Sequence, residues 1–294
     1  MKKLTVIIIM FSVLFTSYVL AQDNEVNEKI VIEKDPAKLR FGLMGFCSVG
    51  WLAPENDIII KRANPGIGFG WGLNTEIFIN KTTSFRTGIS LSTFKASLYY
   101  NDNELTSNSD FDKTYYVVNK REFQQWPSDN INPPDGEIRQ LTTRKYKLSY
   151  VNIPLMLKLK TKEIGYLTYF GEFGGVLGFK TKAKVEDKYL EVDTLTYEPF
   201  NDSEEKNTTS DYDLQNGTQL IRAGLCVGAG AEYNFSGSTS LFFQVNWNYF
   251  MTNMMRKKEK DDYLRSFDSD LKKFEKVNSK SIPGSITVTV GILF

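Results

Sequence analysis

Hydrophobic and polar residues alternate with a period of two along most of the chain after residue 38. This period indicates β-strands, because successive side chains of a strand point to opposite faces. The final stretch shows it clearly, since Ile286, Val288 and Val290 share one face and Thr287 and Thr289 the other. The pattern predicts an all-β protein with eight strands, over residues 39–52, 66–80, 83–100, 145–161, 165–182, 218–235, 238–252 and 283–294.

The connections between these strands alternate between short and long. Three are tight turns, at residues 80–82, 162–164 and 236–237. Four are long loops, at residues 53–65, 101–144, 183–217 and 253–282. An even number of strands with short turns at one end is the plan of outer-membrane barrels. We therefore expect residues 39–294 to form an eight-stranded antiparallel up-and-down transmembrane β-barrel with short periplasmic turns and long extracellular loops.

A soluble eight-stranded barrel would show the same alternation. The residues on the polar face therefore distinguish a soluble barrel from a membrane barrel. That face is rich in Gly, Ser, Thr and Asn, whereas a solvated outer surface carries denser Lys and Glu. A narrow lumen needs small residues and charges that can pair. We predict a lumen charge network formed by Arg40, Glu76, Arg86, Lys158, Glu172, Arg222 and Glu232. Aromatic residues near both strand ends of the other face match the two girdles of a membrane barrel.

The N-terminus resembles a secretion signal followed by a polar segment. Lys2 and Lys3 precede an apolar run from Leu4 to Leu20, and we expect cleavage after Ala21. An uncleaved membrane anchor is the alternative, because the run has almost the length of a span. Residues 22–38 are polar and acidic and are expected to form a periplasmic tail. Export and a barrel together predict the bacterial outer membrane.

The amino-acid composition further limits the reactions and ligands that the protein can support. The sequence contains no His, which excludes Ser-His-Asp and Cys-His catalysis and His-ligated metals. Its formal net charge of +1 gives no electrostatic case for nucleic acid. We expect no cofactor and no enzymatic activity. Cys47 and Cys226 are predicted on opposite faces of the wall, where a disulfide cannot form.

One pair of predicted strands carries a family resemblance. Tyr150–Lys158 reads Y-V-N-I-P-L-M-L-K, and after a tight turn Phe170–Gly175 reads F-G-E-F-G-G. This resembles the PorT-like outer-membrane β-barrel family of Bacteroidetes, in which a Y-x-x-I-P-L-x-x-K strand precedes an aromatic- and Gly-rich strand. The resemblance implies a barrel over about residues 39–294, an account of Pro154 inside a strand, and an accessory role in type IX protein secretion.

Two long loops hold the candidate partner-binding residues. In loop 253–282, apolar residues recur at steps of three and four, which predicts a short amphipathic helix. That helix would be either a docking surface or a lid on the barrel mouth. In loop 101–144, aromatic residues would either bind a partner or pack the loops on one another. The candidates are Tyr115, Tyr116, Phe123, Trp126, Phe267, Leu271 and Phe274.

These observations support three hypotheses for function. The first is a non-enzymatic barrel whose loops 101–144 and 253–282 bind another envelope or secretion protein, with outer-membrane lipid around the wall. The second is a small pore or a stand-alone structural barrel. A lumen spanned by ion pairs of the Arg222–Glu172 type would argue against the pore. The third, a barrel enzyme, is disfavoured by the absence of His.

Overall fold

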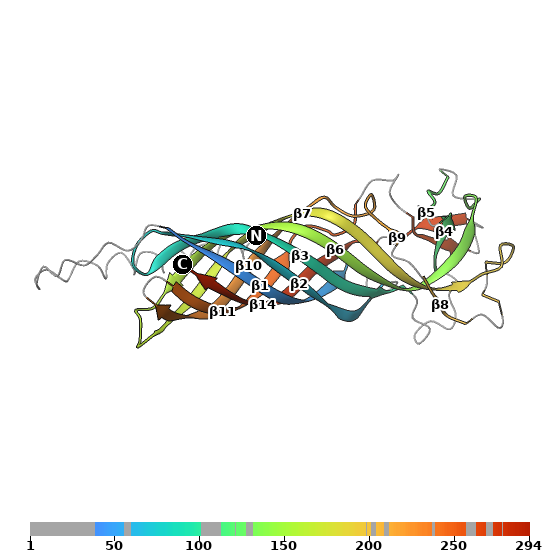
Figure 1. Ribbon diagram of the computed structural model, residues 1–294. Helices are drawn as coiled ribbons and strands as arrows, with labels where there is room; N and C mark the ends of the chain where they lie inside the picture. The colour runs from blue at the N-terminus through green and yellow to red at the C-terminus, as the bar shows by residue number, and fades with distance from the viewer. Residues whose placement is uncertain are drawn as a thin grey trace, which may run out of the picture. The chain divides into compact units, whose positions relative to one another are not determined.

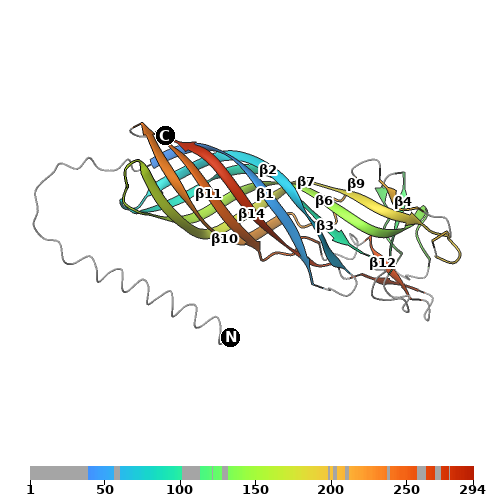
Figure 2. The ribbon, with the colours of Figure 1, turned by 90° about the horizontal axis from the view of Figure 1, so that it is seen from below.

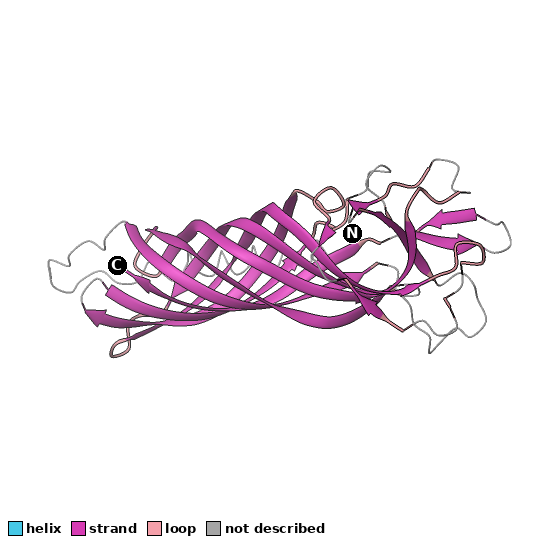
Figure 3. Ribbon diagram, turned by 45° about the vertical axis from the view of Figure 1, so that its right-hand side comes forward, coloured by secondary structure: helices cyan, strands magenta, loops and turns pink. Residues whose placement is uncertain are grey.

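The computed structural model describes most of the chain after residue 38. Only strands, turns and irregular segments occur in the described part (Figure 3). Within it, no helix is long and apolar enough to cross a membrane. The described residues are 39–55, 60–100, 113–120, 122–127, 132–197, 199–200, 204–208, 212–236, 239–256, 263–268, 273–277 and 279–294. The predicted signal peptide and acidic tail, residues 1–38, lie outside this description.

Eight long strands form a closed antiparallel ring (Figure 1). Each pairs with the next in chain order, and the last pairs with the first, from Gly42 opposite Leu293 to Pro54 opposite Ser281. The expected eight-stranded up-and-down barrel is confirmed. Closure removes the unpaired strand edges that an open sheet would expose. The eight strands are β1 (Leu39–Pro54), β2 (Lys61–Phe78), β3 (Thr83–Tyr99), β6 (Glu137–Lys160), β7 (Leu167–Glu191), β10 (Ile221–Ser236), β11 (Thr239–Phe250) and β14 (Ser281–Leu293).

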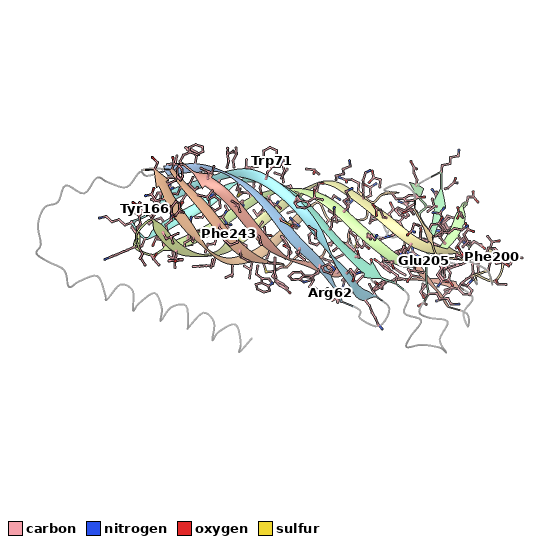
Figure 4. The ribbon with its side chains drawn as sticks, turned by 60° about the horizontal axis from the view of Figure 1, so that its bottom comes forward. Arg62, Trp71, Tyr166, Phe200, Glu205 and Phe243 are labelled. Carbon is pink, nitrogen blue, oxygen red and sulfur yellow. The ribbon has the colours of Figure 1, made fainter. Side chains whose placement is uncertain are left out.

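The two faces of the wall differ as the alternation predicts. Large apolar side chains cover the outer surface, among them Phe69 and Trp71, which are 64% and 62% exposed. Trp71 and Phe243 project away from the ribbons in Figure 4. Inward positions carry small and polar residues such as Ser90 and Asn246, which are buried. An apolar outside and a polar inside is the arrangement of a barrel surrounded by lipid.

Partway along β3, β6 and β7, the apolar residues change from the outward face to the inward face, and the polar residues change from the inward face to the outward face. On β6, Val151 and Leu155 point outward and Asn152 inward, but towards the loop end Lys147 points outward and Leu148 is buried. The lipid-facing run of β6 is nine residues, 151–159, which agrees with the roughly nine to eleven that a tilted strand needs to cross the hydrocarbon. The inversion therefore marks the place where these strands leave the membrane.

Beyond this boundary, the loop segments form strands of their own. The β6–β7 pair extends to Arg139 opposite Glu191, well past the expected strand ends at residues 145 and 182. Figure 2 shows β4, β9 and β12 near the ends of β6 and β7. The shorter strands are β4 (Thr114–Asn119), β5 (Glu122–Phe123), β8 (Lys206–Asn207), β9 (Tyr212–Asp213), β12 (Arg265–Asp268) and β13 (Lys273–Lys276).

The predicted amphipathic helix in loop 253–282 is wrong. The described part of this loop forms the antiparallel pair β12–β13, with Phe267 opposite Phe274. Arg265 of β12 also pairs with Tyr115 of β4. A backbone ladder to a strand from another loop satisfies the amides here, so tertiary pairing overrides the three- and four-residue spacing.

Pro154 lies inside β6 without ending the strand. It keeps its place opposite Val176 of β7, while the ladder to β3 passes from the Thr87–Leu155 pair directly to Ser90–Asn152. Proline has no N–H to donate, so an interruption in the hydrogen bonding to one neighbouring strand is expected. Gly88 faces this gap with a φ of +155°, and a Cβ there would lie 2.1 Å from the Leu73 carbonyl oxygen. Only glycine fits this position.

The described loop-end part has an apolar interior. Inward side chains of the barrel strands, such as Phe94, Leu98 and Leu148, pack there. Their partners, such as Tyr116 and Met254, come from the segments that the sequence predicted to be long loops. The polar lumen and this cluster follow one another along the same strands. The extracellular half thus has a core like that of a soluble β-protein.

Replacing Leu148 tests this division. Leu148 is fully buried in the apolar cluster, so Leu148→Ala should lower the free energy of unfolding by roughly 2–5 kcal/mol. Leu155→Ala, on the same strand, should cost much less because Leu155 faces lipid and leaves no internal cavity. Urea unfolding in detergent micelles measures both, and equal losses would contradict the assignment of the two environments.

Candidate functional site

The lumen holds one buried ion pair near its middle. Arg86 of β3 donates from Nε and Nη2 to the two carboxylate oxygens of Glu172 of β7, at 2.7 and 2.6 Å. Asn246 of β11 donates to the same carboxylate at 2.5 Å. A bidentate pair with a further donor offsets much of the desolvation that buries two charges. It also joins three strands across the barrel.

A second group of charges lies nearer the tight turns. The ammonium group of Lys160 lies 2.6 Å from a carboxylate oxygen of Glu76. Lys158 pairs with Glu232, which also accepts from Arg40 at 3.1 Å. Three cations from β1 and β6 thus surround two carboxylates from β2 and β10. Lys160 was not among the predicted network residues, although its even-numbered position on β6 places it on the inward face with Lys158.

Arg222 does not join either group. A lumen-spanning pair of the Arg222–Glu172 type would have argued against a pore, but the Glu172 carboxylate binds Arg86 and not Arg222. Arg222 donates instead to Asn152 Oδ1 at 2.8 Å. Its guanidinium lies 3.7 Å from the ring centroid of Tyr150 and 4.2 Å from that of Phe250. These aromatic faces stabilise the cation where the polar lumen meets the apolar cluster.

The remaining space in the lumen is small. A cavity of about 100 Å³ is lined by Arg86, Arg222, Asn152 and Asn246 together with other polar and aromatic side chains. It has room for a few water molecules. No group of three or more Cys, Asp or Glu residues suited to a metal ion occurs within the described ranges. The charged side chains described above pair with one another across the lumen.

The candidate aromatic residues of the loops are brought together, but in the interior. Tyr115, Trp126 and Phe274 belong to a buried cluster, against which Tyr197 and Phe267 pack. Trp126 and Phe274 have ring centroids 4.4 Å apart. Such contacts contribute roughly 0.5–1.5 kcal/mol each beyond simple burial. The structure thus favours the alternative in which these aromatics pack the loops on one another.

The other face of β4 contributes to the apolar cluster of the loop end. Tyr116 is buried there, and Phe123 packs against it with ring centroids 5.6 Å apart. Beside them, Arg144 donates to both carboxylate oxygens of Asp187, at 2.7 and 2.6 Å. This buried pair was missed by sequence reasoning, because it depends on the register that places Arg144 opposite Asp187. Leu271, the remaining candidate, lies outside the described residues.

A tight turn after β7 presents apolar side chains to solvent. The Tyr197 amide donates to the Asp193 carbonyl at 2.8 Å, and the Leu195 amide donates to the Asp193 carboxylate at 2.9 Å. The hydroxyl of Tyr115 anchors the turn by donating to the Tyr197 carbonyl at 2.9 Å. Leu195 is 87% exposed and Phe200 54% exposed. The hydrogen bonds hold the backbone of residues 193–197, and exposed apolar side chains such as these are suited to recognition.

These features define a bacterial outer-membrane β-barrel with a folded assembly of loop strands. The chain belongs to the family described as "Outer membrane protein beta-barrel domain", which matches it over residues 21–256, more than half of its length. The protein is therefore located in the bacterial outer membrane. A search of curated proteins gives no match.

Several solved structures are similar to the chain in fold. The outer membrane protein OprG from Pseudomonas aeruginosa is 9% identical, with a TM-score of 0.42, and the match covers 88% of this chain and 96% of that one. Neisserial surface protein A is 11% identical, with a TM-score of 0.35 and coverage of 86% and 95%. A major outer membrane protein from Thermus thermophilus is 11% identical, with a TM-score of 0.38 and coverage of 87% and 98%.

Breaking the central ion pair should destabilise the barrel. Arg86→Met leaves the buried Glu172 carboxylate without its guanidinium partner, which should cost roughly 3–5 kcal/mol of unfolding free energy. The double variant Arg86→Met/Glu172→Leu removes both charges and should recover most of this loss. Urea unfolding in micelles measures both variants. A double variant as unstable as the single one would show that the pair itself stabilises the wall.

The loop-end assembly should lose stability in alkali. Burial, followed by the nearby Asp187 carboxylate, raises the pKa of Tyr116 well above 10.0, and burial together with Tyr100 does the same for Tyr146. The folded state keeps both phenols neutral, whereas an unfolded chain ionises them near pH 10. Their stabilisation is therefore complete below pH 10 and is lost as the pH rises above it.

Near-ultraviolet circular dichroism as a function of pH follows this transition. Tyr116→Phe removes one ionising group and should move the alkaline loss of signal to higher pH. Tyr166→Phe, an exposed tyrosine in the turn before β7, serves as the matched control and should leave the transition in place. A transition unaffected by Tyr116→Phe would contradict the role of this phenol.

Proposed function

We propose that the protein is a non-enzymatic outer-membrane anchor whose loop-end assembly binds another envelope protein. The observation that carries the proposal is the exposed turn at residues 193–197, with Phe200 just beyond it, next to a folded assembly outside the membrane. Leu195 and Phe200 are exposed there, while the aromatic side chains beneath the turn are buried. A preorganised apolar contact loses little conformational entropy on binding.

Loops 101–144 and 253–282 have a different role in this proposal from the one expected. Their aromatic residues Tyr115, Trp126 and Phe274 form the platform, and the turn that rests on it makes the contact. The paired charges on neighbouring strands support the same region. Lys188 Nζ lies 2.9 Å from Glu205 Oε2, and Lys206 Nζ lies 2.6 Å from Glu191 Oε2.

The class of partner follows from the resemblance to the PorT-like family, which supports a component of type IX protein secretion as the first candidate. A pore is the alternative function. The ion pairs that cross the lumen and the apolar cluster above it favour anchoring over conduction. The absence of His supports a non-enzymatic role.

Isolation of the protein from its native outer membrane in mild detergent tests the proposal. The double variant Leu195→Ser/Phe200→Ser should lose a stoichiometric partner that the wild type retains, as detected by mass spectrometry. The matched control Ile164→Ser/Tyr166→Ser alters two other exposed large hydrophobic residues, at the turn between β6 and β7, and it should keep the partner.

Two other outcomes would contradict the proposal. A partner retained by every variant would place the contact on another surface. A protein isolated alone in every case would leave a stand-alone barrel, and conductance in planar bilayers would then separate a pore from a structural role.

A further inference from the structure

Arg222 is a buried cation that has no carboxylate among its contacts with the described residues. It is only 7% exposed. Two other buried arginines, Arg86 and Arg144, each donate to both oxygens of a carboxylate. Within the described part of the chain, the guanidinium of Arg222 makes one hydrogen bond, from Nη2 to Asn152 Oδ1 at 2.8 Å. Its Nε is buried without a hydrogen-bond partner. The guanidinium therefore has donors left for a further ligand.

The aromatic rings around Arg222 favour its burial without neutralising its charge. The guanidinium carbon lies 3.7 Å from the ring centroid of Tyr150, 4.2 Å from that of Phe250 and 5.8 Å from that of Phe94. The face of a ring attracts a cation through its quadrupole, but the ring carries no net charge. A buried ion usually has a partner of opposite charge, because its removal from water is unfavourable. The contacts of Arg222 supply no such partner.

A cavity inside the barrel adjoins Arg222. Its volume is about 100 Å³, and Arg222 forms part of its wall. Asn152 and Asn248 line it together with the rings of Phe94 and Phe250, so it lies where the polar lumen meets the apolar cluster. A cavity of this size has room for a small ion with a few water molecules.

Hydroxyl groups on the cavity wall have hydrogens to donate. Asn152 Nδ2 donates to Ser92 Oγ at 2.8 Å. Asn248 Nδ2 donates to Ser285 Oγ at 3.3 Å and to Thr287 Oγ1 at 3.2 Å. Each of these hydroxyls acts as an acceptor in its bond with the amide, and each still carries one hydrogen of its own. A ligand in the cavity thus meets donors from β3 and β14 in addition to the guanidinium of β10.

The acceptors on the cavity wall belong to a different part of it. Gln244 Oε1 and Asn246 Oδ1 are buried without a hydrogen-bond partner. Both side chains donate through their amide nitrogens to the carboxylate of Glu172, which places them beside the ion pair of Glu172 and Arg86. Water molecules suit these two oxygens, because water can donate to them. The part of the wall around Arg222 suits a ligand that accepts hydrogen bonds and carries negative charge.

We propose that Arg222 binds a small monovalent inorganic anion, such as chloride, in this cavity. One guanidinium balances one negative charge, so a monovalent ion matches the site and a dianion does not. A halide accepts hydrogen bonds from any direction, which suits donors that come from several strands. The bound anion neutralises the charge at the junction between the polar lumen and the apolar cluster and thereby stabilises the barrel. This role is independent of the protein partner proposed for the turn at residues 193–197.

Urea unfolding of the full-length protein in a neutral detergent tests the proposal. Sodium chloride is replaced stepwise by sodium gluconate at constant ionic strength, which keeps the screening of charges constant. Gluconate carries the same charge but is too bulky for the cavity. Once chloride exceeds its dissociation constant, each tenfold increase should lower the unfolding equilibrium constant of the wild type about tenfold, because one anion is released on unfolding. A stability that is the same in chloride and gluconate would overturn the proposal.

Variants assign the effect to the cavity. Arg222→Met removes the cation and should abolish the dependence on chloride. Arg62→Met is the matched control, because the guanidinium of Arg62 also faces an aromatic ring, 5.2 Å from the centroid of Trp51, but its side chain is exposed. This control should keep the full dependence. A dependence that persists in Arg222→Met, or one that is lost equally in Arg62→Met, would contradict binding at Arg222.

Crystals of the wild type grown in sodium bromide decide the question if Arg222→Met does not fold. Anomalous scattering should reveal one bromide ion in the cavity, within hydrogen-bond distance of the Arg222 guanidinium. A cavity that holds only water in these crystals would overturn the proposal, as would bromide bound only at other places.

Discussion

The change of surroundings along β3, β6 and β7 is the constraint on which the rest of the structure depends. A strand in hydrocarbon must turn its apolar side chains outward, and the same strand in water must turn them inward. On β6 this change takes place between Val151 and Ser149, without a break in the pairing with β3. One continuous strand pair therefore serves as a membrane wall below this level and as a layer of a soluble-type β-structure above it.

The two interiors that result are stabilised in different ways. Charged and amide side chains hold the lumen together, and each depends on partners from other strands, as Glu172 depends on Arg86 and Asn246. Apolar contacts predominate in the loop-end core, where the buried Arg144–Asp187 pair is a matched charged contact. Arg222 stands between them, with an amide partner on one side and aromatic rings on the other. Burying a charge at this junction is acceptable because both kinds of environment contribute to its stabilisation.

The same boundary organises the outer surface. Lysines begin where lipid-facing residues end, and the exposed turn at residues 193–197 follows the end of β7. The barrel thus has three zones in sequence along its strands, namely an apolar belt, a zone with exposed lysines on β6 and β7, and a presented turn. In the proposed function the outer zones make the contacts, while the belt and the filled lumen provide a rigid support.

The sequence by itself determined the barrel. Alternation, the number of strands and the contrast between short and long connections depend on local period and turn chemistry, and these survive in any tertiary context. It also placed residues such as Arg86 and Glu172 on the inward face. Which charges pair was decided by the tertiary structure, because a pair such as Arg86 and Glu172 joins strands that are far apart in the sequence. The β12–β13 pair, the burial of Trp126 and the Arg144–Asp187 pair were likewise beyond the sequence. The short loop strands are stabilised by hydrogen bonds to β4 and by a shared apolar core. Neither kind of contact produces a hydrophobic periodicity in the sequence of these strands.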